Sequence, residues 1–177
     1  DSWGIGTHLV TGGNQAALGG VYKLAAKKEN GVFIPTLKIS SSYEKTTNPG
    51  IKQVYRFFDK NGQALADLIT LGSAKVNKGE THIFYHPFSA QDMFVMRKNA
   101  YQDAVPLLKK QMENGKRIAP SPTLKEIQES SREKLSHFDK SYKRQVNPHI
   151  YKVSLSTELK NLKGNLILQA KMAEDKI

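Results

Sequence analysis

The strongest structural signal in the chain is the stretch Gln53-Val54-Tyr55-Arg56-Phe57-Phe58-Asp59-Lys60-Asn61-Gly62-Gln63-Ala64-Leu65-Ala66-Asp67-Leu68-Ile69-Thr70-Leu71. Its two ends are rich in aromatic and aliphatic residues, as strands are. Between them lies Asp59–Gly62, which contains Asn-Gly, the strongest short signal for a hairpin turn. The sequence therefore predicts two antiparallel strands, over residues 53–58 and 64–71.

A second hairpin precedes this one. Residues 21–26 read as a strand, Glu29-Asn30-Gly31 as a turn, and residues 32–40 as a returning strand that Pro35 interrupts. Further downstream, alternation of polar and apolar residues predicts strands at 81–85 and 93–96. Residues 21–89 are therefore expected to form a β-hairpin segment of a mostly β domain.

The pattern becomes helical after Pro106. A helix is expected from there to Gly115, which would act as its C-cap. Thr123 and Glu126 have the spacing of a capping box, and an apolar stripe continues to about Asp139. A short strand at 151–155 and a last helix capped by Ser156 follow. Residues 90–177 are thus predicted to be a mostly helical C-terminal extension, and the fold class to be α+β.

Composition excludes several classes of protein. The chain has 177 residues, of which 38% are hydrophobic and 24% charged, and it has no cysteine. Disulfide scaffolds, thiolate zinc sites and cysteine nucleophiles are excluded, and no apolar run approaches the roughly 18 residues that a membrane helix needs. We expect a cytoplasmic protein. Because an apolar, glycine-punctuated segment begins directly at Asp1, we also expect a C-terminal fragment of a larger enzyme.

The net charge is +11 and the isoelectric point is near 9.7, which indicates an anionic partner. A basic nucleic-acid-binding module is one alternative. Basic residues are interleaved with acidic ones along the predicted helices, however, and Tyr142 beside Lys143-Arg144 is the only aromatic residue in a basic cluster. The pattern favours solvated helix faces over a nucleic-acid surface.

Two segments are suited to phosphate. In Gly4-Ile5-Gly6-Thr7-His8, glycines let backbone N–H groups approach an anion, and Thr7 and His8 add side-chain donors. Two glycines at this spacing also occur in ordinary turns. The second segment surrounds Pro49-Gly50 with the cations Lys45, Lys52 and Arg56, which suits a phosphate group but also the rim of a basic hairpin. His82 and His86 are four residues apart, but the strand-like alternation and Pro87 argue against a helix that would bring them together, so no metal site is predicted.

Taken together, four segments resemble nicotinate phosphoribosyltransferases, over the C-terminal third of that family. They are Ser2–Leu9, Leu18–Leu24, Glu44–Lys52 with Arg56, and the late Asn147–Val153 followed by Leu155-Ser156. The resemblance covers nearly the whole chain.

The resemblance implies an activity and a fold. The family joins nicotinate to phosphoribosyl pyrophosphate, giving nicotinate mononucleotide and pyrophosphate, with ATP hydrolysed through a phosphorylated histidine and Mg²⁺ required. It implies an irregular, TIM-like α/β barrel, of which residues 1–20 would supply a late strand and its phosphate-binding loop. Gly4, Gly6 and Thr7 match the loop that holds the ribose 5-phosphate, and His8 lies beside it. The resemblance places Lys45, Lys52 and Arg56 near the pyrophosphate or ATP phosphates, or gives them a structural role that supports that site.

The resemblance also implies what lies elsewhere. The catalytic histidine and the residues that contact the nicotinate ring belong to upstream segments of the family, so the 177-residue chain is expected to be inactive without them. The expected partners are those small-molecule substrates, the N-terminal part of the same enzyme and a second subunit, with neither nucleic acid nor membrane. A nicotinamide or quinolinate phosphoribosyltransferase remains an alternative, because the residues that distinguish nicotinate from nicotinamide and quinolinate are not in these motifs.

Overall fold

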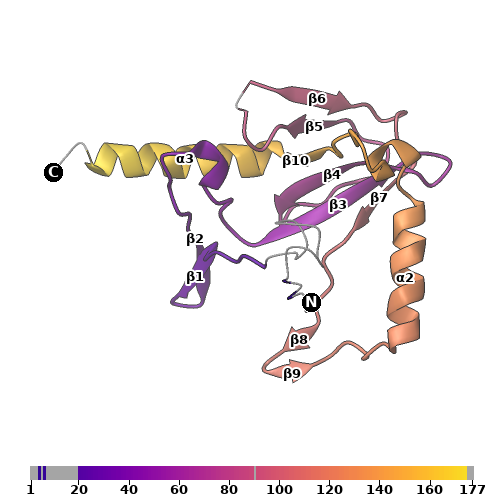
Figure 1. Ribbon diagram of the computed structural model, residues 1–177. Coiled ribbons are helices and arrows are strands. Elements are labelled where there is room, and N and C mark those ends of the chain that lie inside the picture. Colours follow the sequence, from indigo (N-terminus) through magenta and orange to yellow (C-terminus); the bar gives the residue numbers. More distant parts are fainter. Residues whose placement is uncertain (1–3, 5, 7–19, 90, 175–177) are drawn as a thin grey trace.

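The computed structural model describes residues 4, 6, 20–89 and 91–174, and these form an α+β fold (Figure 1). A mixed six-stranded sheet has the order β6-β5-β10-β4-β3-β7, and two further hairpins, β1–β2 and β8–β9, lie outside it. The strands are β1 (Ala26–Glu29), β2 (Val32–Pro35), β3 (Lys52–Phe58), β4 (Ala64–Leu71), β5 (His82–Tyr85), β6 (Met93–Met96), β7 (Asp103–Pro106), β8 (Met112–Glu113), β9 (Lys116–Arg117) and β10 (Val153–Leu155). The helices are α2 (Leu124–Ser136) and α3 (Thr157–Glu174), with short 3-10 turns at η1 (Tyr43–Lys45) and η2 (Lys140–Lys143).

The hairpin β3–β4 forms the middle of the sheet, as its sequence predicts. Its register pairs Lys52 with Leu71 and shifts by one residue at Phe57/Phe58, next to the turn. The Asp59 carboxylate accepts hydrogen bonds from the backbone N–H groups of Asn61 and Gln63, both at 2.8 Å, and Gly62 adopts the positive φ of 75° that the turn requires. The turn chemistry of the sequence therefore fixes this register.

The strand β10 occupies the place between β4 and β5. It runs parallel to β4, with Ser154 opposite Leu68, and meets β5 at Leu155 opposite Tyr85. The two expected segments, a β-hairpin segment (21–89) and a mostly helical C-terminal extension (90–177), share this sheet. The later segment does hold both long helices, but it also places β6, β7 and β10 in the same sheet as β3, β4 and β5.

One face of the sheet carries the hydrophobic core. Phe57 and Phe84 are fully buried, and their rings meet edge to face with centroids 5.0 Å apart. Alternation places the other core side chains that belong to strands on the same face, and Tyr101, which precedes β7, belongs to the same cluster. The remaining buried members are Ala66, Leu68, Met96 and Tyr101.

The helix α3 packs against β4 and β5. The Ser156 hydroxyl accepts a hydrogen bond from the Leu159 backbone N–H at 3.3 Å, so Ser156 caps this helix as predicted. Leu159 is fully buried, and the Lys160 ammonium lies 4.0 Å from the centre of the Tyr85 ring. The helix then continues beyond the sheet (Figure 1). Among the described residues, no helix is both long and apolar enough to cross a membrane.

Two sequence predictions are wrong in detail. The expected helix from Pro106 to Gly115 is instead the end of β7 and the β8–β9 hairpin, whose turn residues Asn114 and Gly115 have φ of 48° and 75°. The Asn-Gly pair that was read as a helix end is a hairpin turn of the type that needs two positive φ values. The strand expected at 21–26 is displaced to Ala26–Glu29, although its Asn30-Gly31 turn is correct.

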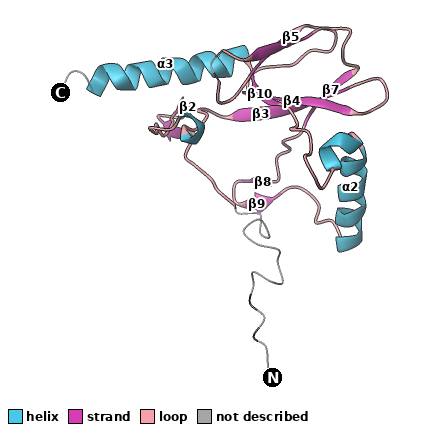
Figure 2. Cartoon of the chain, turned by 45° about the horizontal axis from the view of Figure 1, so that its top comes forward, coloured by secondary structure: helices cyan, strands magenta, loops and turns pink. Residues whose placement is uncertain are grey.

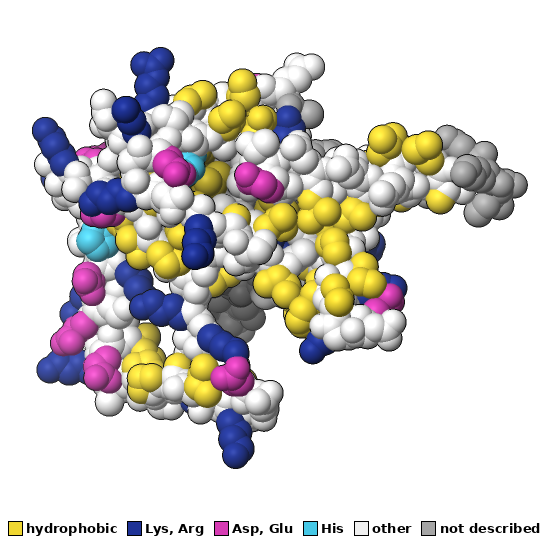
Figure 3. All heavy atoms as spheres, turned by 180° about the vertical axis from the view of Figure 1, so that it is seen from behind, with side chains coloured by type: hydrophobic (Ala, Val, Ile, Leu, Met, Phe, Trp, Pro, Cys, Tyr) yellow, Lys and Arg dark blue, Asp and Glu magenta, His cyan; other side chains and the backbone are white. Residues whose placement is uncertain are grey.

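The helix α2 extends away from the sheet (Figure 2). Its capping box is present as predicted: Thr123 Oγ1 accepts from the Glu126 N–H, and the Glu126 carboxylate accepts from the Thr123 N–H at 2.6 Å. The apolar stripe of the helix is nevertheless exposed, by 76% at Leu124 and 51% at Ile127. Hydrophobic side chains also gather on the surface of the β1–β2 hairpin (Figure 3), where Val32 and Phe33 are 66% and 53% exposed.

Candidate functional site

The loop from Thr46 to Gly50 is held in place by two lysines from different elements. At the start of β3, the Lys52 ammonium donates to the carbonyl oxygens of Asn48 at 2.9 Å and Gly50 at 2.5 Å. From α3, Lys163, only 1% exposed, donates to the Thr46 carbonyl at 3.2 Å and to Asn48 Oδ1 at 3.0 Å. Burial lowers the pKa of both ammonium groups. The two cations thus hold the loop through four hydrogen bonds.

Gly50 is required in this loop for two reasons. Its φ is +80°, a conformation that side chains disfavour, and a Cβ would lie 3.2 Å from Leu71 Cδ2. Its N–H also donates to the Ala25 carbonyl at 2.7 Å, which attaches the loop to the segment entering β1. The Pro-Gly turn of the sequence motif is therefore a packed structural element.

The fixed loop forms one wall of a basic pocket. The pocket has a volume of about 420 Å³ and is lined by Val21, Lys23, Lys38, Ser40, Glu44, Lys45, Thr46 and Thr47. Within the described part of the chain, none of its three lysines forms an ion pair, and all three are exposed. The lining therefore combines three basic residues with one acidic residue, Glu44.

The hydroxyl groups of the pocket are oriented by the backbone. Thr47 Oγ1 accepts from the Lys38 N–H at 2.8 Å, Thr46 Oγ1 from the Ser40 N–H at 3.3 Å, and Ser40 Oγ from the Ser42 N–H at 3.4 Å. A hydroxyl that accepts one hydrogen bond keeps its own hydrogen for donation. Three hydroxyl donors and three ammonium groups together form a donor set that suits phosphate oxygens.

Arg56 lies in a different environment. Its guanidinium forms a bidentate pair with Asp67, at 2.9 Å and 2.8 Å, and lies 4.7 Å from the centre of the Phe138 ring. The Tyr151 hydroxyl donates to Asp67 Oδ1 at 2.9 Å. The hydrogen bonds that the guanidinium donates to Asp67 raise the pKa of Arg56. This cluster ties β3 and β4 to the segments around Phe138 and Tyr151.

Tyr151 gives this cluster a dependence on pH. Burial, and then the neighbouring Asp67 carboxylate, raise the pKa of its hydroxyl well above the usual value of about 10. An acid whose pKa is raised by folding stabilises the folded state fully below its unfolded pKa of about 10, and that stabilisation is lost as the pH rises from there toward the raised pKa of the folded state. We expect Tyr151→Phe to flatten the alkaline fall in the free energy of unfolding.

Urea titrations of the chain at several pH values between 8 and 11 measure this slope. Tyr22→Phe, at a side chain that is 95% exposed, is the matched control and should keep the wild-type slope. Identical slopes for wild type and Tyr151→Phe would contradict the assignment.

The structure separates the predicted site residues. Lys45 lines the basic pocket, whereas Lys52 and Arg56 do not and are bonded to protein groups. Gly4 and Gly6 are exposed, and Thr7 and His8 lie outside the described residues. Lys23 and Lys38 were not among the predicted site residues, because neither stands in a basic cluster of the sequence; the fold brings both to the pocket.

Four histidines have structural neighbours. His82 Nε2 lies 3.2 Å from the Tyr101 hydroxyl, His86 Nδ1 accepts from the Phe88 and Ser89 N–H groups, and His137 Nδ1 lies 2.9 Å from the Gly62 carbonyl. The ring of His149 packs edge to face on Tyr142. Over residues 20–89 and 91–174, no three histidine or acidic side chains come together in a group that could hold a metal ion.

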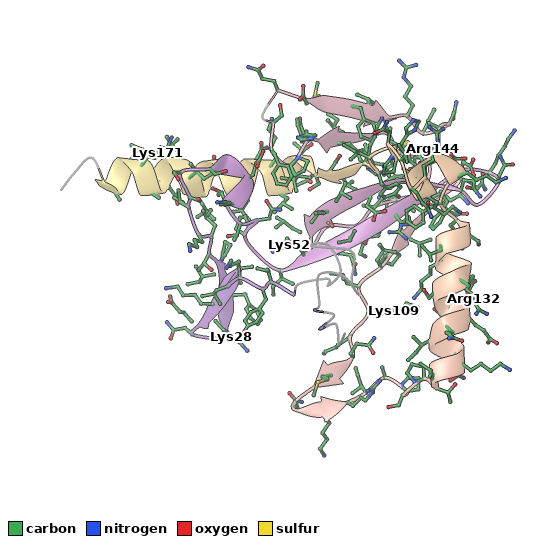
Figure 4. All side chains as sticks on the ribbon, in the orientation of Figure 1. Lys28, Lys52, Lys109, Arg132, Arg144 and Lys171 are labelled. Carbon is green, nitrogen blue, oxygen red and sulfur yellow. The ribbon has the colours of Figure 1, made fainter. Side chains whose placement is uncertain are left out.

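The remaining cations are spread over separate elements. Figure 4 labels Lys28 on the β1–β2 hairpin, Arg132 on α2, Arg144 after η2 and Lys171 near the end of α3, far from one another. The space-filling view likewise shows Lys and Arg scattered among acidic side chains (Figure 3). A nucleic-acid surface would gather such charges into a stripe or patch, whereas on the face that Figure 3 shows they are spread over several elements.

Comparison with known proteins agrees with the motifs. Residues 51–163 match the family model for the nicotinate phosphoribosyltransferase C-terminal domain. Nicotinate phosphoribosyltransferases of Caenorhabditis elegans and Bacillus subtilis are 37% and 36% identical over 96% and 89% of this chain, which spans 29% and 32% of their length. The crystal structure of human nicotinic acid phosphoribosyltransferase superposes on 68% of this chain and 24% of its own, with a TM-score of 0.61 and 27% identity. The chain therefore belongs to the family of nicotinate phosphoribosyltransferase C-terminal domains.

Proposed function

We propose that the chain acts as the C-terminal part of an enzyme that joins nicotinate to phosphoribosyl pyrophosphate, releasing nicotinate mononucleotide and pyrophosphate in the synthesis of NAD. The observation that carries the proposal is the basic pocket of Lys23, Lys38 and Lys45, built on the loop of the Glu44–Lys52 motif. The relatives that support it carry the name nicotinate phosphoribosyltransferase, which favours nicotinate over nicotinamide or quinolinate.

In this proposal the chain contributes phosphate recognition, while the reacting groups come from the rest of the enzyme. Lys45 and its two pocket neighbours receive the pyrophosphate or ATP phosphates as point charges, and Thr46 and Thr47 add hydroxyl donors. Lys52 and Arg56 act as positioning residues, since their donors are already engaged. Gly4, Gly6, Thr7 and His8 remain the proposed loop for the ribose 5-phosphate, at the end of a TIM-like barrel.

The proposal includes ATP and Mg²⁺, and it places the enzyme in the cytoplasm. The donor set of the pocket fits a phosphate chain, whether of ATP or of phosphoribosyl pyrophosphate. The described residues offer no cluster for Mg²⁺, so no step is assigned to the ion through them. When bound, magnesium would neutralise phosphate charge.

The test is alanine substitution at Lys38 and Lys45 in the enzyme that carries this chain. Loss of one charged contact to phosphate is worth about 1.5–3 kcal/mol, so the KM for phosphoribosyl pyrophosphate or ATP should rise by about 10-fold or more. The KM for nicotinate should stay within about twofold, because in this proposal the pocket lysines do not bind nicotinate.

Lys28→Ala is the matched control, since Lys28 is an exposed lysine on the β1–β2 hairpin that does not line the pocket. It should leave both constants unchanged. If the Lys38 and Lys45 variants behave like Lys28→Ala toward all phosphate-bearing substrates, the pocket has no role in their binding.

A further inference from the structure

Lys163 is a buried lysine of the helix α3, and lysine is almost never fully buried without partners. Its ammonium group donates to the Thr46 carbonyl and to Asn48 Oδ1. These acceptors stand 117 and 115 residues earlier in the chain. The side chain therefore joins the late helix to the loop that precedes β3.

Thr46 is the residue at which this helix and the basic pocket meet. It lines the pocket, although it is only 6% exposed. Its carbonyl accepts from Lys163, while its Oγ1 accepts from the Ser40 N–H. Its neighbours in the chain, Lys45 and Thr47, line the pocket as well. A shift of the Thr46 backbone would therefore displace one cation and one hydroxyl of the pocket.

The loop also supports a second cation of the pocket. The Lys38 N–H donates to Thr47 Oγ1 at 2.8 Å, and the Thr47 N–H donates to the Lys38 carbonyl at 3.2 Å. This two-way bond attaches the backbone of Lys38 to the loop that carries Lys45. The relative positions of the two lysines thus depend on the loop.

Lys52 holds a different part of the same loop. Its ammonium donates to the carbonyls of Asn48 and Gly50, and neither residue lines the pocket. Lys163 instead donates to Thr46, which does. Of these two lysines, Lys163 has the more direct connection to the pocket.

We propose that Lys163 is a positioning residue for phosphate recognition, which fixes the Thr46 backbone and thereby holds Lys45 and Thr47 where a phosphate-bearing substrate meets them. The inference rests on the proposed function of the pocket. It assigns part of the affinity to a side chain that does not itself line the pocket. Binding groups need such support, because their geometry must be held by residues that are themselves locked by packing and hydrogen bonds.

The first test is Lys163→Met in the enzyme that carries this chain, since Met removes the ammonium and keeps a side chain of similar length. The KM for phosphoribosyl pyrophosphate or ATP should rise by about fivefold or more, with kcat and the KM for nicotinate within about twofold. A role in stability alone would lower the amount of folded enzyme, and hence the apparent kcat, without raising a KM.

Two variants of α3 are the controls. Lys171→Met makes the same change at an exposed position of the helix and should leave all constants unchanged. Leu159→Ala empties a fully buried position and should lower stability without raising the KM of a phosphate-bearing substrate. Asn48→Ala is a milder second variant, which removes one acceptor of Lys163 and should raise the same KM by about twofold or more.

Amide hydrogen exchange in the chain tests the positioning without the reaction. The Thr47 N–H should exchange about 10-fold faster or more in Lys163→Met, because the loop loses hydrogen bonds from a charged group. The Gln102 N–H, which donates to the Phe58 carbonyl at 2.7 Å, is the reference amide and should keep its rate.

The outcomes separate this inference from the proposed function. Unchanged exchange at Thr47 would show that Lys163 does not fix the loop. An unchanged KM in Lys163→Met, in an enzyme whose Lys38→Ala variant has a raised KM, would overturn the positioning role and leave the proposed function standing. If Lys38→Ala leaves every KM unchanged as well, the proposed function of the pocket fails, and the positioning role fails with it.

Discussion

Asp67→Ala is expected to lower the free energy of unfolding of the chain by about 3–5 kcal/mol, the cost of removing one partner from a buried ion pair. The Arg56 and Asp67 side chains are only 18% and 9% exposed, and the carboxylate also accepts the Tyr151 hydroxyl. Its removal leaves the guanidinium between β3 and the Phe138 ring with no carboxylate to accept its donors. Urea denaturation followed by far-ultraviolet circular dichroism measures the loss.

The chain offers a matched control at Asp103. This carboxylate pairs with Lys78 at 2.9 Å, but the two side chains are 53% and 60% exposed, so Asp103→Ala should cost no more than about 1 kcal/mol. The double variant Arg56→Met/Asp67→Leu should recover much of the stability, because it removes both charges. A similar loss for Asp67→Ala and Asp103→Ala would show that the Arg56 cluster does not stabilise the sheet.

Phe57→Ala is expected to cost about 3–5 kcal/mol, as large-to-small changes at buried aromatic residues do. Phe57 is fully buried, and its ring lies 4.8 Å from the Tyr101 ring and 5.4 Å from the His82 ring, centre to centre. No other side chain of the core has so many aromatic neighbours among the described residues. The space left by the ring would lie under the middle of the sheet, where β3 and β4 limit its collapse.

Phe88→Ala is the control for this change, because the Phe88 side chain is 52% exposed and contacts the His86 ring at the rim of the sheet. Its cost should stay below about 1 kcal/mol. The midpoint of urea unfolding should shift strongly for Phe57→Ala and little for Phe88→Ala. Equal shifts would mean that the aromatic cluster around Phe57 is not the core that holds the sheet together.

The sequence predicts those parts of the fold whose cause is local. The β3–β4 hairpin follows from its Asn61-Gly62 turn, and the start of α2 follows from the Thr123–Glu126 capping box. The region around Asn114-Gly115 was misread because apolar residues in a short segment suit a helix and a hairpin equally well. The position of β10 between β4 and β5 depends on contacts about 70–85 residues apart in the chain, which no local pattern contains.

The candidate site was predicted only in part, for a related reason. Lys45 was predicted because it belongs to the group of cations around Pro49-Gly50. Lys23 stands in the Leu18–Leu24 motif without a cationic neighbour, and Lys38 stands in no motif; the path of the chain on either side of the β1–β2 hairpin brings both to the pocket. Lys52 and Arg56 stand in the same motif but have partners that the sequence does not reveal, the carbonyls of the loop and the Asp67 carboxylate. A cation in a motif can bind an anion directly, or it can stabilise the loop that carries the anion-binding residues. An exposed cation such as Lys45 suits the first role, and a buried cation suits the second.

The central position of β10 has a consequence for how the sheet is made. During synthesis, β3 with β4 and β5 with β6 can each pair as soon as they leave the ribosome, because each pair is close in sequence. The two hairpins acquire the strand that joins them only after residue 155 has emerged. Until then each hairpin presents an additional open edge to its surroundings. The completed sheet therefore depends on its latest strand, and non-local pairing of this kind is intrinsically slow.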